Sequence, residues 1–144
     1  LALALAVDER RPLVGVVAIN PPQPDRDALE GLEWMIERGH DRIDAPRLAD
    51  GESGYSSLPT VALVEMARGI LAIDLDAVSV PVLLVTSALD EVVDPATADH
   101  LAELLAAKAT VTRLTLPNSG HVASLGPDRD MLVEAIDRFC ENVT

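Results

Sequence analysis

An aspartate and a histidine that follow two successive predicted strands are the residues of this sequence best placed to do chemistry together. Asp90 comes after an unbroken apolar run at 82–85, and His121 comes after a second strand-like run at 111–116. The carboxyl ends of strands in α/β sheets share one edge, so the two side chains can meet there. An aspartate beside an imidazole fixes its tautomer and stabilises its protonated form, which prepares the histidine to act as a general base.

Neighbouring groups compete for these roles. Glu91 is a second carboxylate on the turn that carries Asp90, although Asp90 fits the pattern better. Asp94 is explained more simply as the cap of the next helix. A lone histidine would more often be structural, but a matched acid in the right chain order favours a functional role for His121.

No metal site and no cofactor are expected. His40 and His100 are predicted to be surface residues, and their spacing would not gather metal ligands. The partner expected for the Asp90–His121 pair is a small-molecule substrate.

The elements around Asp90 and His121 predict an α/β fold with a mostly parallel sheet and flanking helices. The run at 82–85 is typical of a strand buried on both faces. Asp94 and Pro95 predict the start of a helix, and residues 13–19 form a further Val- and Ile-rich strand. Pro127 opens a last helix, whose predicted sheet-facing residues are Met131, Leu132, Ala135, Ile136 and Phe139.

Three segments are expected: core at 1–22, a helical cap at 23–76 and core at 77–144. Pro21 and Pro22 end the first strand, and no strand-like run follows before residue 76. Apolar spacing predicts one helix from Asp25 or Asp27 to Gly39, a surface loop at 40–55, and a second helix from near Ser57 to Leu71.

A cap over the strand ends would control access of substrate. The predicted substrate contacts are Met35 and Val64 from the cap, together with Val92 and Val122 beside the acid and the histidine.

Two segments carry a resemblance to a known family. Leu89-Asp90-Glu91-Val92-Val93-Asp94-Pro95 is similar to the acid turn of the α/β-hydrolases, and Ser119-Gly120-His121-Val122-Ala123-Ser124-Leu125 is similar to their histidine loop. Acid before histidine is also the order of that family. The chain most resembles the C-terminal part of bacterial carboxylesterases and monoacylglycerol lipases. One departure is Gly126-Pro127, where that branch often has Asp after the residue matching Leu125.

The resemblance implies Ser-His-Asp hydrolysis of short to medium acyl esters, with Asp90 and His121 as two members of the triad. No serine that precedes Asp90 lies in a G-x-S-x-G motif; these serines are Ser53, Ser56, Ser57, Ser79 and Ser87. Residues 1–7 resemble the helix that follows the nucleophile elbow. The resemblance thus implies a serine upstream of Leu1, with the N-terminal strands and elbow absent and the chain inactive alone.

Other functions remain open. The same fold hosts dienelactone hydrolases, haloperoxidase-like proteins and dehalogenases, which the identity of the nucleophile would distinguish. A non-catalytic remnant that binds another chain through an exposed sheet edge is a further alternative.

Composition narrows the class of protein. A net charge of -13 argues against nucleic acid or anionic membranes as partners. The apolar stretch at 1–7 is too short to span a membrane, and no targeting signal is evident. Cys140 is predicted to be a small buried hydrophobe, in keeping with a reducing, cytoplasmic location.

Overall fold

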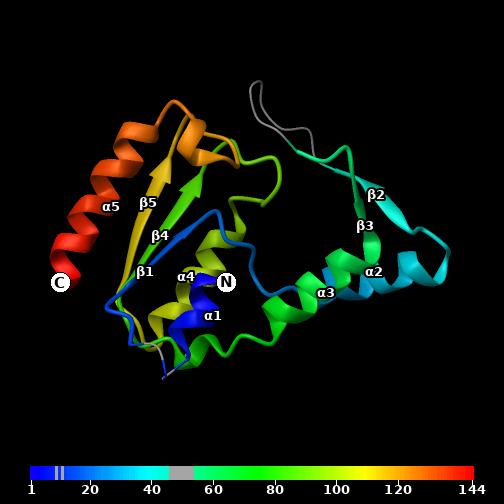
Figure 1. The fold of residues 1–144 in the computed structure, drawn as a ribbon, viewed down its shortest axis with the longest axis horizontal. Helices are drawn as coiled ribbons and strands as arrows, with labels where there is room; N and C mark the ends of the chain where they lie inside the picture. Colours follow the sequence, from blue (N-terminus) through cyan, green and yellow to red (C-terminus); the bar gives the residue numbers. More distant parts are fainter. Residues whose placement is uncertain (9, 11, 46–53) are drawn as a thin grey trace. The chain divides into compact units, whose positions relative to one another are not determined.

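The computed structural model describes residues 1–8, 10, 12–45 and 54–144, and these form two compact units (Figure 1). Unit 1 consists of Leu1–Pro21 and Asp74–Thr144, and unit 2 consists of Pro22–Ile73. Asp90 and His121 both belong to unit 1, so the pair is built within one compact body.

Unit 1 contains a parallel three-stranded sheet with the order β1-β4-β5, whose strands are β1 (Val16–Ile19), β4 (Val82–Ser87) and β5 (Val111–Leu116). The central strand is β4, and its residues 82–85 are each between 0% and 2% exposed. The predicted burial of this run on both faces is thereby confirmed. Because all three strands point the same way, their carboxyl ends lie at one edge of the sheet.

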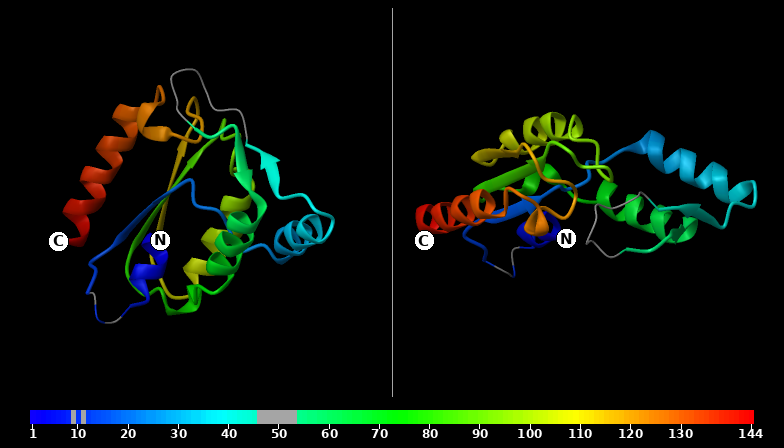
Figure 2. Two further views of the ribbon diagram at one scale, coloured as in Figure 1. Left: turned by 45° about the vertical axis from the view of Figure 1, so that its right-hand side comes forward. Right: turned by 90° about the horizontal axis from the view of Figure 1, so that it is seen from above.

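Helices cover both faces of this sheet. Figure 2 shows α4 (Thr97–Ala106) and α5 (Arg129–Val143) on opposite sides of it. The predicted cap was wrong: α4 begins at Thr97 with Ala96 as its N-cap, and no side chain caps it. Asp94 instead accepts the backbone N–H of Ala96, at 2.9 Å, in the turn before the helix. Unit 1 also contains α1 (Ala2–Ala6), in which Leu3 is buried, and the short 3-10 helices η1 (Leu75–Ala77) and η2 (Ala123–Leu125).

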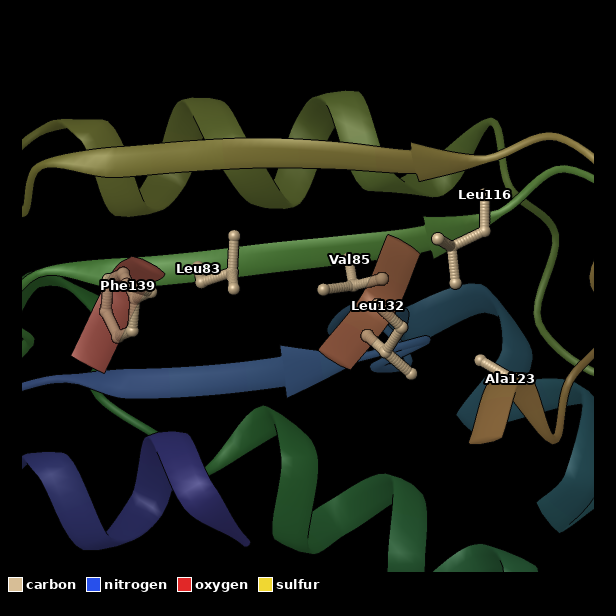
Figure 3. Packing of buried hydrophobic residues seen from close by; sticks show 6 residues of the cluster. All are labelled: Leu83, Val85, Leu116, Ala123, Leu132 and Phe139. Atoms are coloured by element: carbon tan, nitrogen blue, oxygen red, sulfur yellow. The ribbon is translucent and has the colours of Figure 1, made fainter. Parts of the chain in front are cut away.

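One apolar cluster joins the strands to the C-terminal helix and to the segment after His121. Its members come from β4, β5, η2 and α5, and are Leu83, Val85, Leu116, Ala123, Leu132 and Phe139 (Figure 3). Burying a side chain of this size contributes about 1.5–3 kcal/mol, so the cluster fixes α5 and η2 against the sheet. Of the side chains predicted to face the sheet, Met131 is the exception because it is exposed.

Unit 2 is built on two helices, α2 (Arg26–Glu37) and α3 (Thr60–Leu71). The Asp25 side chain caps α2 by accepting the N–H of Ala28 at 2.9 Å, as one of the two predicted caps. Arg68 of α3 pairs with Glu33 of α2 at 2.6 Å. Val64 is 2% exposed, so it belongs to the packed interior of the unit.

The prediction that no strand lies between residues 23 and 76 was wrong. Unit 2 contains a short antiparallel pair, β2 (Arg42–Asp44) and β3 (Ser57–Pro59). Each strand has only three residues, of which the middle one is a large aliphatic side chain, so it is too short for hydrophobic periodicity to reveal it. The Arg42 guanidinium holds the pair together by donating to the Ser57 hydroxyl and carbonyl, both at 2.8 Å.

Two further differences concern unit 2 and the last helix. The second helix begins at Thr60, where the predicted start was near Ser57. Cys140 is exposed, contrary to prediction, because its neighbour Phe139 takes the sheet-facing position and successive helical residues point about 100° apart. Residues 46–53 of the predicted surface loop lie outside the described residues.

No helix within the described ranges is both long enough and apolar enough to cross a membrane.

Candidate active site

The Asp90 carboxylate and the His121 imidazole are in hydrogen-bond contact. His121 Nδ1 lies 3.0 Å from Asp90 Oδ2 and 3.1 Å from Asp90 Oδ1. The aspartate side chain is 1% exposed, whereas the histidine side chain is 32% exposed. The acid is therefore shielded behind a ring that solvent or a ligand can reach.

The acid turn holds the carboxylate through its own backbone. Asp90 Oδ1 accepts the N–H groups of Val92 at 2.8 Å and Val93 at 2.9 Å. An ionised carboxylate can only accept hydrogen bonds. In a neutral imidazole, the contact with Asp90 therefore places the proton on Nδ1 and leaves Nε2 as an acceptor.

His121 Nε2 has no hydrogen-bond partner among the described residues. This nitrogen is on the ring edge opposite the one that Asp90 contacts. A neutral imidazole with a free Nε2 can accept a proton from a nucleophile or a water, while the carboxylate stabilises the cation that results.

Glu91, the competing acid, makes no hydrogen bond to the imidazole in the part of the chain that is described. Its carboxylate instead lies beside Gly120, where an added Cβ would come within 3.0 Å of Glu91 Oε2. Asp90 is thus the carboxylate that the fold brings to His121.

A buried polar cluster shapes the histidine loop. Asp128 accepts hydrogen bonds from the Asn118 backbone N–H at 2.7 Å, the Asn118 amide at 3.0 Å and the Ser119 hydroxyl at 2.9 Å. The Asn118 side-chain bond is the largest cause of a lowered pKa at Asp128; the other Asn118 and Ser119 bonds add to it, and burial opposes it. The loop is therefore held by an ionised, well-bonded carboxylate.

Gly126, noted above as a departure from the resembled family, has a structural reason. A Cβ at this position would lie 2.5 Å from Ser119 Oγ and 2.8 Å from Ser119 Cβ. No side chain fits without moving Ser119, so glycine permits the close approach that brings Ser119 to Asp128.

One residue at this edge of the sheet was missed by sequence reasoning. Asn20 follows β1 directly, and its amide donates to the His121 carbonyl at 2.8 Å. The sequence marked Asn20 only as the end of a strand before two prolines. The available signal was that asparagine tolerates the left-handed backbone, which Asn20 adopts with φ of 47°.

The four predicted substrate-contact residues divide between the units. Val92 is on the acid turn and is exposed, and Val122 follows His121 and is half-buried. Met35 and Val64 belong to unit 2, where Met35 is half-buried and Val64 is buried. The burial of Val64 favours a packing role for that side chain.

Two of the serines are fully buried and hydrogen-bonded elsewhere. Ser87 accepts from Asn20, and Ser119 donates to Asp128. Ser53 lies outside the described residues. The described residues contain no group of three or more His, Cys, Asp or Glu side chains that could hold a metal ion.

The fold of this chain is similar to that of several solved structures. No protein-family model and no curated protein matches the sequence. Among solved structures, a metagenome-derived lipolytic enzyme matches with a TM-score of 0.76 and 24% identity over 97% of this chain and 60% of its own. A thermostable carboxyl esterase from Bacillus coagulans matches with a TM-score of 0.68 and 14% identity over 99% of this chain and 61% of its own.

The chain has the α/β-hydrolase fold. A monoacylglycerol lipase from Paleococcus ferrophilus shares it, with a TM-score of 0.61 and 14% identity over 99% of this chain and 64% of its own. This chain thus spans less than two thirds of the length of these hydrolase-fold proteins, in keeping with the C-terminal portion that the sequence predicted. In such a fold, the edge that carries Asp90 and His121 is where ligands bind.

Proposed function

We propose that this chain supplies the acid and the general base of a hydrolase that acts on carboxylic esters through a serine nucleophile. The observation that carries the proposal is the contact between His121 Nδ1 and the shielded Asp90 carboxylate, with Nε2 bonded to none of the described residues. The lipolytic enzyme, the carboxyl esterase and the monoacylglycerol lipase that share the fold of this chain support ester hydrolysis as the reaction class.

In the proposed reaction, His121 Nε2 takes the proton of a serine hydroxyl while the serine oxygen attacks the ester carbonyl. Asp90 stabilises the imidazolium. When the carbon–oxygen bond to the alcohol breaks, His121 returns the proton to the departing oxygen. A water molecule then repeats the same steps on the acyl-serine, which releases the carboxylic acid and restores the serine.

We place the nucleophilic serine on a segment N-terminal to Leu1 in the full-length protein. Two observations support this placement. Ser87 and Ser119 are fully buried and are engaged by Asn20 and Asp128. No serine among the described residues is hydrogen-bonded to His121.

The test uses the full-length protein, a p-nitrophenyl ester as substrate, and the variant His121→Ala. We expect kcat/KM to fall by about 10³-fold or more, as is typical when a triad member is lost. His100→Ala is the matched control because His100 is exposed on α4, and it should keep the activity of the unmodified protein.

A fluorophosphonate probe, followed by peptide mass spectrometry, locates the nucleophile. We expect the label on a serine N-terminal to Leu1, and no label in His121→Ala. Ester hydrolysis that survives in His121→Ala, or a label on any serine from 1 to 144, would contradict the proposal.

A further inference from the structure

Asn20 has an unusual position for a residue that merely ends a strand. It is 5% exposed, and its backbone N–H donates to the Val85 carbonyl at 2.9 Å, so it extends the β1–β4 ladder by one bond. Its φ of 47° then turns the chain out of the sheet. Its side chain reaches Ser87 of β4 and the backbone of His121.

The Asn20 amide uses its hydrogen-bonding groups on two partners. Its Oδ1 accepts the Ser87 backbone N–H at 2.7 Å. Its Nδ2 donates to the Ser87 hydroxyl at 3.0 Å and to the His121 carbonyl at 2.8 Å. One planar group therefore binds the last residue of β4 and the backbone of the candidate base.

Both partners of the Asn20 amide, Ser87 and His121, are linked to the Asp90–His121 contact. The Ser87 carbonyl accepts the Asp90 N–H at 3.4 Å, so Ser87 is the point from which the acid turn departs. The His121 carbonyl belongs to the residue whose ring contacts the acid. A shift of Asn20 would thus alter the separation between carboxylate and imidazole from both sides.

We propose that Asn20 is a positioning residue that sets the alignment of His121 with Asp90. The proposal rests on the function proposed above. Among the described residues, no hydrogen bond joins the Asn20 side chain to the Asp90 carboxylate or the His121 ring, so its effect is transmitted through the His121 backbone and through Ser87.

Asparagine suits this place for two reasons. It accepts a left-handed backbone more readily than most residues. It also combines an acceptor for the Ser87 N–H with a donor for the His121 carbonyl. Aspartate has the same shape but no donor, so Asn20→Asp would direct a carboxylate at a carbonyl oxygen.

The experiment compares Asn20→Gly, Asn20→Asp and a control in the full-length protein. Glycine removes the side chain without penalising the left-handed backbone, so it isolates the amide group. The control is Thr60→Val, which removes another buried hydrogen bond to a carbonyl, that from Thr60 Oγ1 to His40 O at 2.6 Å. The control residue belongs to unit 2, whereas Asp90 and the residues bonded to it belong to unit 1.

Two measurements separate positioning from general stability. The first is the split between kcat and KM for a p-nitrophenyl ester. The second is the downfield proton NMR signal of His121 Nδ1–H, assigned by its absence in His121→Ala and recorded without substrate. We expect both Asn20 variants to lower kcat by about 10- to 100-fold with KM nearly constant, since small misplacements of catalytic groups have effects of this size. We also expect their Nδ1–H signal to shift or broaden.

Thr60→Val should leave kcat and the Nδ1–H signal unchanged, even if it lowers the melting temperature by as much as the Asn20 variants do. An Asn20→Gly protein with normal kcat and an unchanged signal would overturn the inference. The inference would also be overturned if kcat fell in proportion to the melting temperature in the Asn20 variants and in Thr60→Val alike. Should Asn20→Gly fail to fold, Asn20→Asp decides by the same two readouts. The NMR signal reports the Asp90–His121 contact whether or not the protein hydrolyses esters. Failure of the proposed function would show in a different measurement, as ester hydrolysis that persists in His121→Ala.

Discussion

The backbone N–H of Leu89 donates to the carbonyl of Ser119 at 3.2 Å, which joins the acid turn to the histidine loop just before Asp90 and His121. One step earlier, Ala88 continues the ladder by donating to Leu116 at 2.9 Å. The two loops are thus bonded to each other as well as to their own strands. Preorganisation of this kind is what a catalytic pair requires.

The choice between the two acids can be tested by neutralising each in turn. In the full-length protein, Asp90→Asn should lower kcat by about 10⁴-fold, because the amide no longer supplies the charge that stabilises the imidazolium. Glu91→Gln should have little effect, since Glu91 makes no hydrogen bond to the ring in the described structure. Steady-state ester hydrolysis measures both. The opposite order of sensitivity would show that the orienting acid had been misidentified.

Alanine at two glycines should change stability in opposite directions. Gly126→Ala should lower the free energy of unfolding by about 1–3 kcal/mol, because the new Cβ collides with Ser119. Gly31→Ala should raise it by about 0.5–1 kcal/mol, because Gly31 lies inside α2 with nothing within 4 Å of an added Cβ. Urea unfolding of both variants provides the measurement. If Gly126→Ala raised the free energy of unfolding as Gly31→Ala does, the histidine loop would be able to shift and make room for the new Cβ.

Acid should destabilise the histidine loop through Asp128. The pKa of this carboxyl is lowered from its ordinary value of 3.8 in the folded chain. A lowered folded pKa contributes stability that is present above the unfolded value and is lost as the pH falls through the folded value. We therefore expect the free energy of unfolding to drop below about pH 4, and to drop less steeply in Asp128→Asn. Asp137→Asn, on an exposed site of α5, is the control and should keep the original slope.

The substrate contacts predicted at Met35 and Val64 can be tested separately, because Val64 is buried and Met35 is half-buried. Val64→Ala should cost roughly 2 kcal/mol of stability, because it removes buried methyl groups and leaves a cavity. Met35→Ala should instead change the ratio of rates on short and longer acyl esters by about tenfold, with melting temperature nearly constant. Ester-length profiles and thermal unfolding of both variants in the full-length protein test this. A uniform loss on all esters in Met35→Ala, parallel to lost stability, would assign Met35 to packing.

Apolar runs predicted the strands of unit 1 correctly. The run at 82–85 became the central strand, and the bounds of β5 coincide with the predicted 111–116. Chain order also predicted which acid and which histidine meet. These features depend on local pattern and on the common edge of parallel strands, both of which can be read from a sequence.

Features that depend on distant partners were not predictable in this way. Asn20 bonds to residues 67 and 101 positions further on, so nothing near it in the sequence reveals its partners. Gly126 looked like a departure from the resembled pattern until Ser119 was found where a side chain would be. The strands β2 and β3 are too short to show periodicity, and the side-chain bonds between them come from Arg42, 15 positions before its partner Ser57.

The pairing of β1 with β4 has a consequence for how the chain folds. Val16 is in register with Val82, so this ladder closes only after all of unit 2 has been made. Contacts between such distant positions slow folding and leave apolar segments unpaired in the meantime. During synthesis, β1 therefore leaves the ribosome long before its partner β4. Asn20 can bond to the His121 carbonyl only later still, once His121 has been made. The hydrogen bonds at the strand-end edge are thus among the last that a nascent chain can complete.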